Sequence, residues 1–484
     1  MENIRYDLIT ALPEIVIVCM AMFILLADLF LKPSNRITIY VLAQVTLLTA
    51  AYLTVSTHAQ GVGYAFSGTF VDDAMADVLK LMIYLGTSLI FVYSRQYLQL
   101  RNMFRGEFYA LVLFSVVGMM IMVSGQHMLT LYIGLELLSL SLYALVALDR
   151  DNAKATEAAM KYFVLGALAS GLLLYGMSMI YGMTGSLNIA DINHALNTDG
   201  NIQSVLVLGL VFIVAGLAFK LGAVPFQMWL PDVYEGSPTA VTILISSVPK
   251  LAAFALVIRL LVQGLGVHSL VVEWQQMLVI MAVLSIFIGN VTAIAQTNLK
   301  RMLAYSTISH VGFVLLGLMS ASINGFNSAM FYIASYVFMT LAGFGMILLL
   351  SRKGFEADKL DDLKGLNQRS PWHAFLMLIV MFSMAGVPPT LGFYAKFSVL
   401  QAALQAGFLW VVVFAVLMAV VGAFYYLRII KLMYFDEPLD HHPIQAPMDM
   451  RIVLGFNALG LLAIGIMPQS LMELCLYAIG KSLN

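Results

Sequence analysis

Residues 219–232 read FKLGAVPFQMWLPD, an apolar stretch that contains a lysine and a helix-breaking proline. The segment to which it belongs, 204–230, is long and apolar enough to cross a lipid bilayer, for which about 20 residues suffice. A charge inside the bilayer is costly, and a proline removes a helical hydrogen bond. A plain membrane anchor would therefore carry neither Lys220 nor Pro225, and their presence points to a special role for this helix.

The composition around this stretch is that of a membrane protein. The chain has 484 residues, of which 61% are hydrophobic and 11% are charged, and its formal net charge is -1. Continuous apolar runs such as LVLFSVVGMMIMV at 111–123 predict spanning helices and argue against the alternating pattern of a transmembrane barrel. The near-neutral charge gives no pull toward nucleic acid. The two cysteines, Cys19 and Cys475, show no metal or disulfide spacing.

A window of about 20 residues predicts fourteen transmembrane helices, and hence an all-α polytopic membrane protein. The first run is longer than the core of a signal peptide, so we expect it to remain as a helix. The predicted spans are 8–31, 38–57, 75–95, 108–125, 128–148, 158–183, 204–230, 239–264, 275–297, 302–320, 325–351, 373–402, 408–434 and 450–478.

The basic residues indicate how these helices are oriented. Of the 25 lysines and arginines, 18 lie in the loops or at the helix ends on the side reached after odd-numbered helices. Cytoplasmic loops are enriched in basic residues, so this pattern predicts that both termini face away from the cytoplasm.

Four ionisable residues lie well inside predicted helices: Glu136, Lys220, Lys250 and Lys396. Burial disfavours a charged lysine and a nearby carboxylate favours it, so a lysine held between the two effects can load and release a proton. If Glu136 faces Lys220, moving either side chain changes the proton affinity of the lysine. We therefore predict that these residues transfer protons.

The other embedded charges have simpler interpretations. Asp77 precedes Lys80 by three residues, which is the spacing of an ion pair on one helix face. Arg259 lies five residues from a predicted helix end and can reach the membrane surface. Glu14 and Asp28 are also expected at the membrane surface.

Prolines accompany the three buried lysines. Pro225 follows Lys220, Pro249 directly precedes Lys250, and Pro388-Pro389 precede Lys396. Each proline frees backbone carbonyls that water or neighbouring groups must satisfy. An ordinary kink would explain one such helix, but the recurrence predicts hydrated breaks, above all in helices 7 and 12.

A weak internal repeat divides the chain. Aligning the segments that begin at Gly125 and Ala295 gives a shift of 170 residues, and aligning Pro225 with Pro388 gives 163. Five helices would then repeat, and an odd number of crossings inverts the second copy, as in many transporters. The predicted units are 1–100 (helices 1–3), 104–266 (first repeat), 273–436 (inverted second repeat) and 437–484 (a loop and helix 14).

His310 lies near the middle of a predicted span, on a polar strip with Ser306 and Ser309. A histidine can pass a proton between its two ring nitrogens, although a lone helix histidine is often only a packing residue. No second histidine lies at a similar depth, which argues against a bis-histidine haem.

The stretch FKLGAVPFQMWLPDVYEGSPTAVTILISSVPKLAAF and the glutamate in LYIGLELLSLSLYAL resemble the antiporter-like membrane subunits of respiratory complex I. The resemblance covers nearly the whole chain. PDVYEGSPT followed by SSVPK is similar to N-type subunits, whereas L- and M-type subunits read closer to LPDAHxEAPT. Lysine rather than glutamate at 396 argues against M-type subunits, and a chain without a long extension after helix 14 argues against L-type subunits.

The resemblance implies that other subunits carry electrons from NADH through FMN and iron-sulfur clusters to quinone, and that this energy moves protons through this chain. It implies no cofactor or metal on this chain. Glu136, Lys220, Lys250 and Lys396 match the family's proton-transfer residues, and Lys161 is either part of their polar axis or an interfacial lysine. The expected location is a bacterial inner membrane, among adjacent membrane subunits and lipids. A stand-alone sodium/proton antiporter and a passive scaffold are the alternatives.

Overall fold

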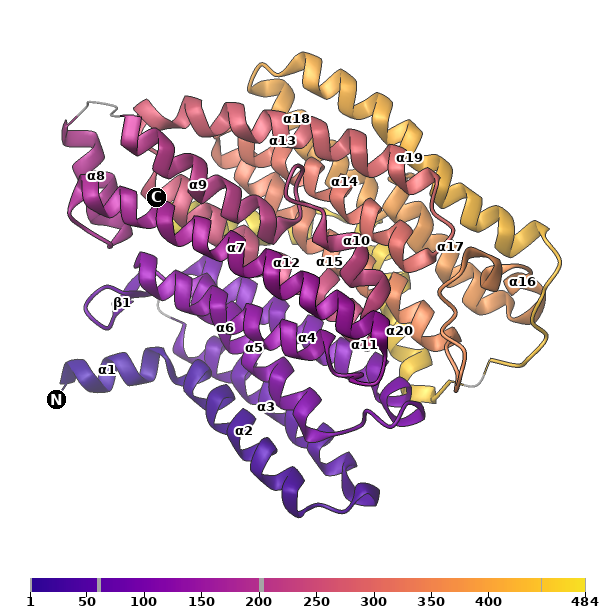
Figure 1. Ribbon diagram of the computed structural model, residues 1–484. Helices are drawn as coiled ribbons and strands as arrows, with labels where there is room; N and C mark the ends of the chain where they lie inside the picture. The colour runs from indigo at the N-terminus through magenta and orange to yellow at the C-terminus, as the bar shows by residue number, and fades with distance from the viewer. Residues whose placement is uncertain (1, 59–61, 200–203, 445, 484) are drawn as a thin grey trace.

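The computed structural model describes residues 2–58, 62–199, 204–444 and 446–483, which form a bundle of long helices (Figure 1). Within these residues, 13 helices are long and apolar enough to cross a membrane. The predicted all-α polytopic membrane fold is confirmed. The remaining predicted span, 373–402, is split into α17 (Pro371–Ala385) and α18 (Leu391–Gln405), which are each too short to cross alone.

The spanning helices lie over the predicted spans. They are α2 (Leu12–Phe30), α3 (Ile37–Thr57), α4 (Ala74–Leu100), α5 (Gly106–Ser124), α6 (Met128–Val146), α7 (Ala153–Thr184), α9 (Ser204–Leu221), the run of α11 (Thr239–Ser246), α12 (Pro249–Val257) and η2 (Ile258–Gly264), α13 (His268–Ile294), α14 (Leu299–Met319), α15 (Ile323–Leu350), α19 (Leu409–Phe435) and α20 (Met448–Ile466). Shorter elements are α1 (Glu2–Thr10), η1 (Pro33–Asn35), β1 (Gly63–Ala65), β2 (Phe70–Asp72), α8 (Ile189–Asp199), α10 (Trp229–Gly236), η3 (Leu360–Leu363), α16 (Leu366–Arg369) and α21 (Gln469–Leu483).

The core is formed by the α11–α12 run, α14 and α15. Within the most apolar 18-residue segment of each of these helices, 100%, 94% and 89% of the residues are buried. The corresponding fraction is 28% in both α2 and α19. Helices α2 and α19 lie at opposite edges of the bundle (Figure 1). The outer helices therefore present apolar side chains to lipid or to other proteins, and the inner helices form the packed interior.

The loops that precede α6 and α14 are held by the same backbone hydrogen bonds, 171 residues apart. In the first copy, Met128 N donates to Leu187 O and Ile189 N donates to Gln126 O. In the second copy, the equivalent bonds run from Leu299 N to Asp358 O and from Leu360 N to Thr297 O. This offset differs by one residue from the 170 of the sequence alignment. Five spans separate equivalent helices, so the two copies are inverted. The boundaries 104–266 and 273–436 stay a prediction.

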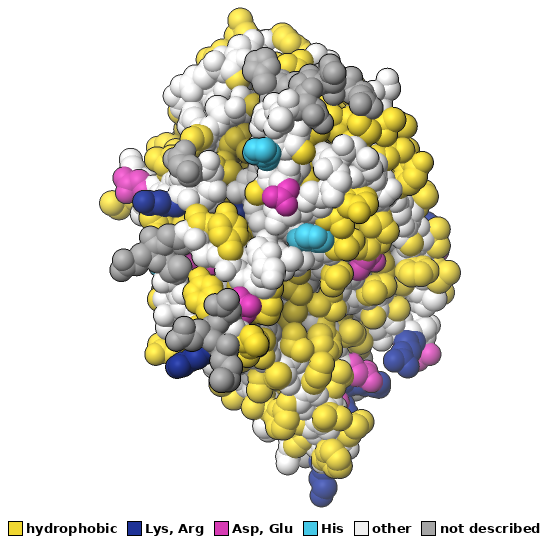
Figure 2. All heavy atoms as spheres, turned by 90° about the vertical axis from the view of Figure 1, so that its left-hand side faces the viewer, with side chains coloured by type: hydrophobic (Ala, Val, Ile, Leu, Met, Phe, Trp, Pro, Cys, Tyr) yellow, Lys and Arg dark blue, Asp and Glu magenta, His cyan; other side chains and the backbone are white. Residues whose placement is uncertain are grey.

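The two ends of the chain lie at one end of the bundle, beside the β1–β2 hairpin. Asp7 accepts a hydrogen bond from the backbone N–H of Phe66 at 3.0 Å, and the Ser482 hydroxyl accepts one from Met75 N at 2.9 Å. On the face that contains this end, apolar side chains cover much of the surface and lysine and arginine side chains are few (Figure 2). An even number of crossings places both ends on one side in this way.

Candidate functional site

The first helix break separates α9 from α10 and contains Pro225. Helix α9 ends at Leu221, and Gly222 follows with a φ of +81°, which a residue without a Cβ adopts readily. The last carbonyls of α9 have no helical partners. Lys250 of α12 supplies a hydrogen-bond donor for two of these carbonyls. Its Nζ donates to the Leu221 carbonyl at 2.7 Å and to the Lys220 carbonyl at 3.5 Å. A cation at a helix C-terminus is also favoured by the helix dipole.

Lys220 is the penultimate residue of α9 and turns toward α6. Its Nζ donates a hydrogen bond to the Ser139 hydroxyl at 2.7 Å. Glu136 lies one turn before Ser139, and its charge acts on Lys220 from beyond ion-pair distance, as far as the described residues show. Its Oε1 is buried and has no hydrogen-bond partner. The structure therefore brings the predicted carboxylate and lysine near enough for their charges to interact, and Ser139 binds the lysine directly.

The two lysines of the first repeat share one small cavity. It has a volume of about 20 Å³ and is lined by Lys220, Lys250, Ser139, Tyr162 and Trp229, among others. Its lining is mostly apolar but includes the two lysines and Ser139, and its volume has room for about one water molecule. The Tyr162 and Trp229 rings stack with their centres 4.6 Å apart and close one side. The two lysines therefore line the same water-sized space.

The second helix break separates α17 from α18 and contains Pro388-Pro389. Helix α17 ends at Ala385, and Gly386 follows with a φ of +87°. The Nζ of Lys396, on α18, donates to the carbonyls of Ala385 at 2.8 Å and Met384 at 3.1 Å. The predicted breaks in helices 7 and 12 are therefore both present, and each has a lysine at the carbonyls that it frees.

The third proline, Pro249, also lies between two helical segments. Helix α11 ends at Ser246, and Pro249 occupies the first turn of α12, directly before Lys250. Proline is favoured at this position because the first N–H groups of a helix have no helical partner.

His310 of α14 is almost fully buried between two tyrosines. Its Nδ1 lies 2.7 Å from the Tyr332 hydroxyl and its Nε2 lies 3.1 Å from the Tyr426 hydroxyl. Tyr426 also hydrogen bonds Ser306. The charge of Lys396 acts on the imidazole. Because both ring nitrogens face hydroxyl groups, the imidazole can take up a proton on one side and release one on the other.

Lys161 lies apart from the buried lysines, in a group of ion pairs at the protein surface. Its side chain is 45% exposed, and its Nζ is 2.9 Å from both Glu157 and Asp232. Arg301 of α14 binds the other oxygen of Asp232 at 2.8 Å. Burial raises the pKa of Asp232, but hydrogen bonds from Lys161 and Arg301 outweigh it, so the net shift is downward. This geometry favours the interfacial interpretation of Lys161.

The expectations for three other embedded charges, Arg259, Lys80 and Glu14, were wrong. Arg259 does not reach the surface: it is fully buried and holds both oxygens of Asp73 at 2.8 and 2.9 Å. Lys80 pairs with Glu14 at 2.7 Å, in the interior, rather than with Asp77. Buried charges need close partners, and these partners come from helices distant in sequence.

Sequence reasoning missed Ser139, Tyr426 and Lys300 as contributors to the buried polar groups. Ser139 follows Glu136 by three residues, so helical spacing alone could have indicated it. Tyr426 lies in an apolar helix, and its contact with His310 joins residues 116 positions apart. Lys300 was expected to be a loop residue, but its side chain is buried. No group of three or more potential metal ligands occurs in the described residues.

Comparisons with known proteins agree with this architecture. Residues 125–422 match the family model described as NADH:quinone oxidoreductase/Mrp antiporter, TM. The chain is 70% identical to NADH-quinone oxidoreductase subunit N of Methylovorus glucosotrophus and 56% identical to that of Nitrosomonas europaea, with 100% of each chain covered in both matches. It also matches a chain of respiratory complex I from Thermus thermophilus at 30% identity, with a TM-score of 0.81, covering 95% of this chain and 98% of that one.

The fold and the buried lysines define a polytopic membrane protein of the antiporter-like class. The chain belongs to the NADH:quinone oxidoreductase/Mrp antiporter transmembrane family.

Proposed function

We propose that this chain is the N-type subunit of a bacterial NADH-quinone oxidoreductase and that it translocates protons. Its relatives over the full length are named as that subunit. Electrons would pass from NADH to quinone on other subunits, which hold the FMN and iron-sulfur clusters. The chain would lie in the inner membrane among adjacent membrane subunits, with both termini in the periplasm, because its basic loops belong in the cytoplasm.

The observation that carries the proposal is the placement of a lysine amine at each helix break. Lys250 and Lys396 each donate to the last carbonyls of a broken helix, and Lys250 is fully buried while Lys396 is partly buried. An amine in such a place is desolvated, which favours the neutral form, while the carbonyls and the helix dipole favour the charged form. The two forms are thereby brought close in free energy, as a proton carrier requires.

In the first repeat, the proton would move between Lys220 and Lys250 through the water-sized cavity. Lys220 donates a hydrogen bond to Ser139, and the charge of Glu136 acts on its amine. A shift of α6 relative to α9 would change the distance from the amine to the carboxylate, and with it the proton affinity of the amine. Energy released elsewhere in the complex can act on the proton in this way without a redox centre in this chain.

In the second repeat, the proton would pass through His310 to Lys396. The imidazole has a hydroxyl at each nitrogen, and Lys396 lies close enough for its charge to act on the ring. Release would follow near Lys396, on the far side of the second break. Lys161 would contribute at most from the membrane surface, through Asp232.

NADH-driven proton uptake by inverted membrane vesicles tests the proposal in the assembled complex. We expect Lys220→Ala and Glu136→Ala to lower uptake, and Lys220→Arg to fail too because arginine does not release its proton. Lys32→Ala changes an exposed loop lysine and is the matched control. Normal uptake in assembled Lys220→Ala would contradict the proposal.

The same preparation separates the alternatives. Co-purification of the chain with flavin and iron-sulfur subunits supports the proposal. An isolated chain that exchanges sodium for protons in liposomes would instead support a stand-alone antiporter.

A further inference from the structure

A buried lysine outside the proposed axis lies at the other end of the molecule from the chain termini. Lys300, the second residue of α14, is only 2% exposed. Its Nζ donates to the backbone carbonyl of Ser237 at 2.8 Å, in the loop between α10 and α11. This contact is with a neutral group and leaves the positive charge without an ion-pair partner of its own, as far as the described residues show. A buried lysine of this kind calls for an explanation.

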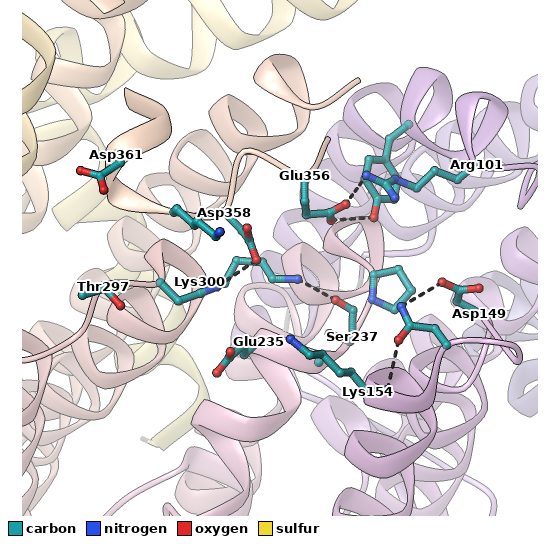
Figure 3. A pocket seen from close by; sticks show the side chains of 16 residues that line it. Arg101, Asp149, Lys154, Glu235, Ser237, Thr297, Lys300, Glu356, Asp358 and Asp361 are labelled. Atoms are coloured by element: carbon teal, nitrogen blue, oxygen red, sulfur yellow. Dashed lines mark hydrogen bonds and ion pairs between the residues drawn. The ribbon is translucent and has the colours of Figure 1, made fainter. Parts of the chain in front are cut away.

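Lys300 lines a deep polar cleft. The cleft has a volume of about 710 Å³ and is enclosed by the ends of α4 and α10, the loops before α7 and α14, and the segment 356–361. Figure 3 shows the Lys300 side chain extending toward Ser237, with Glu356 and Arg101 on one side and Asp358 nearby. A cleft of this size and polarity holds many water molecules. It lies among the basic loops, and hence at the predicted cytoplasmic end.

Charged groups surround Lys300 on several sides. Burial disfavours its charged form most strongly, while the carboxylates of Glu356, Asp358 and Glu235 favour that form and Arg101 opposes it. Arg101 is itself paired with Glu356. The acids at the rim can collect protons from the bulk and hold them near the lysine, as carboxylates around a cleft raise the local concentration of cations.

Polar groups continue from this lysine into the second repeat. Lys300, Thr307 and His310 lie on one face of α14, because their spacings of seven and three residues are close to whole helical turns. The Tyr336 hydroxyl donates to Thr307 Oγ1 at 2.8 Å, and its ring centre lies 5.2 Å from that of His310. The Tyr234 hydroxyl is also buried close to Thr307. The Thr307 hydroxyl therefore has a tyrosine hydroxyl close to it from two different elements, Tyr336 of α15 and Tyr234 of α10.

The equivalent cleft of the first repeat, at the opposite end of the molecule, differs in the charge of its lining. It has a volume of about 500 Å³ and includes Gln126 and Ala190, which correspond to Thr297 and Asp361 through the 171-residue offset. No charged residue lines it among the described residues. Of these two clefts, only the one that contains Lys300 has charged side chains in its lining.

We propose that Lys300 is a proton-uptake residue that delivers protons from this cleft to His310 and Lys396 without passing through Lys220. The ammonium group gives its proton to the water and hydroxyl groups on the inner side, and water in the cleft replaces it. The net charge of the lysine is restored in each cycle, and no electron is transferred. This inference rests on the proposed proton-translocating function.

The test is NADH-driven proton uptake by inverted vesicles that contain the assembled complex, measured at pH 6 and pH 8. Lys300→Met should lower uptake roughly tenfold or more at pH 8, in keeping with the loss of a positioned proton donor. The defect should be smaller at pH 6, where protons are more plentiful. Lys300→Arg retains the charge and the donor to Ser237 but should also fail. Lys359→Met, at an exposed position on the same cleft, is the matched control.

Two results would overturn the inference. One is uptake in assembled Lys300→Met equal to that of Lys359→Met at both pH values. The other is full activity of Lys300→Arg, which would show that a fixed charge suffices. Lys396→Ala is measured in parallel: if it abolishes uptake while Lys300→Met does not, only the uptake role is wrong. If neither lowers uptake, the proposed function itself fails.

Discussion

At each of the two helix breaks a lysine amine binds the last carbonyls of the broken helix, but the two lysines come from different helices. Leu221 and Ala385, the last residues of α9 and α17, are 164 positions apart, and a glycine of positive φ follows each. At the first break the lysine comes from the neighbouring helix α12, and at the second it comes from α18, the other half of the same broken helix. The repeat therefore retains an amine at these carbonyls, although Lys250 and Lys396 do not occupy equivalent positions.

The breaks also differ in what lies beside the lysine. The first has a second amine, Lys220, in a shared water-sized cavity. The second has Met384 at the position equivalent to Lys220 and depends on His310 and its tyrosines. In the proposed mechanism, the first repeat would hold a proton on either of two amines, whereas the second would pass it along tyrosine hydroxyl groups and His310.

The largest effect is expected from removing the lysine at either break. Lys250→Met and Lys396→Met leave buried carbonyls without a donor, at a cost of about 1–3 kcal/mol, and remove a proton carrier. We expect proton uptake to fall roughly tenfold or more in both, in keeping with the loss of a group that transfers protons. Lys431→Met, at an exposed lysine of α19, is the control. A normal rate in one of the two variants would show that the breaks are not functionally equivalent.

An intermediate effect is expected from changing Glu136 near the first break. The second repeat has Thr307 at the equivalent position. It makes no hydrogen bond through its buried Oε1 and acts on Lys220 through its charge. Glu136→Gln retains the shape and removes the charge, so uptake should fall several-fold while the complex assembles normally. The pH dependence of uptake should also change, because the amine loses the carboxylate that favours its charged form. An unchanged pH profile would argue against coupling between these two residues.

The smallest effect is expected from the surface ion pairs. The pKa of Asp232 is lowered from 3.8 in the folded chain, so its ion pairs contribute stability above that pH and lose it as the pH falls through the folded value. Asp232→Asn should change uptake at pH 7 less than twofold, because solvent screens exposed pairs. Its melting temperature should lie slightly below that of the unaltered chain at pH 7, and the difference should shrink as the pH falls below 3.8. A large loss of uptake would place Lys161 and Asp232 on the proton path.

The sequence was a good guide wherever a feature depended on neighbouring residues. Apolar runs predicted the spans, and Pro225 and Pro388-Pro389 marked the breaks because proline acts on its own helix. Contacts between distant segments could not be predicted in this way. Arg259 and Asp73 are 186 residues apart, and Lys250 meets the Leu221 carbonyl across 29 residues. Such pairs depend on how helices pack, which local patterns in a single sequence do not reveal.

The most direct test of the central claim is proton uptake by assembled complexes that carry Lys250→Arg or Lys396→Arg. Arginine can still donate to the carbonyls at each break and remains positively charged, but it does not release a proton at physiological pH. If the two lysines carry protons, both variants assemble and oxidise NADH with fewer protons taken up per electron. An unchanged ratio of protons to electrons in both variants would show that the lysines only stabilise the broken helices.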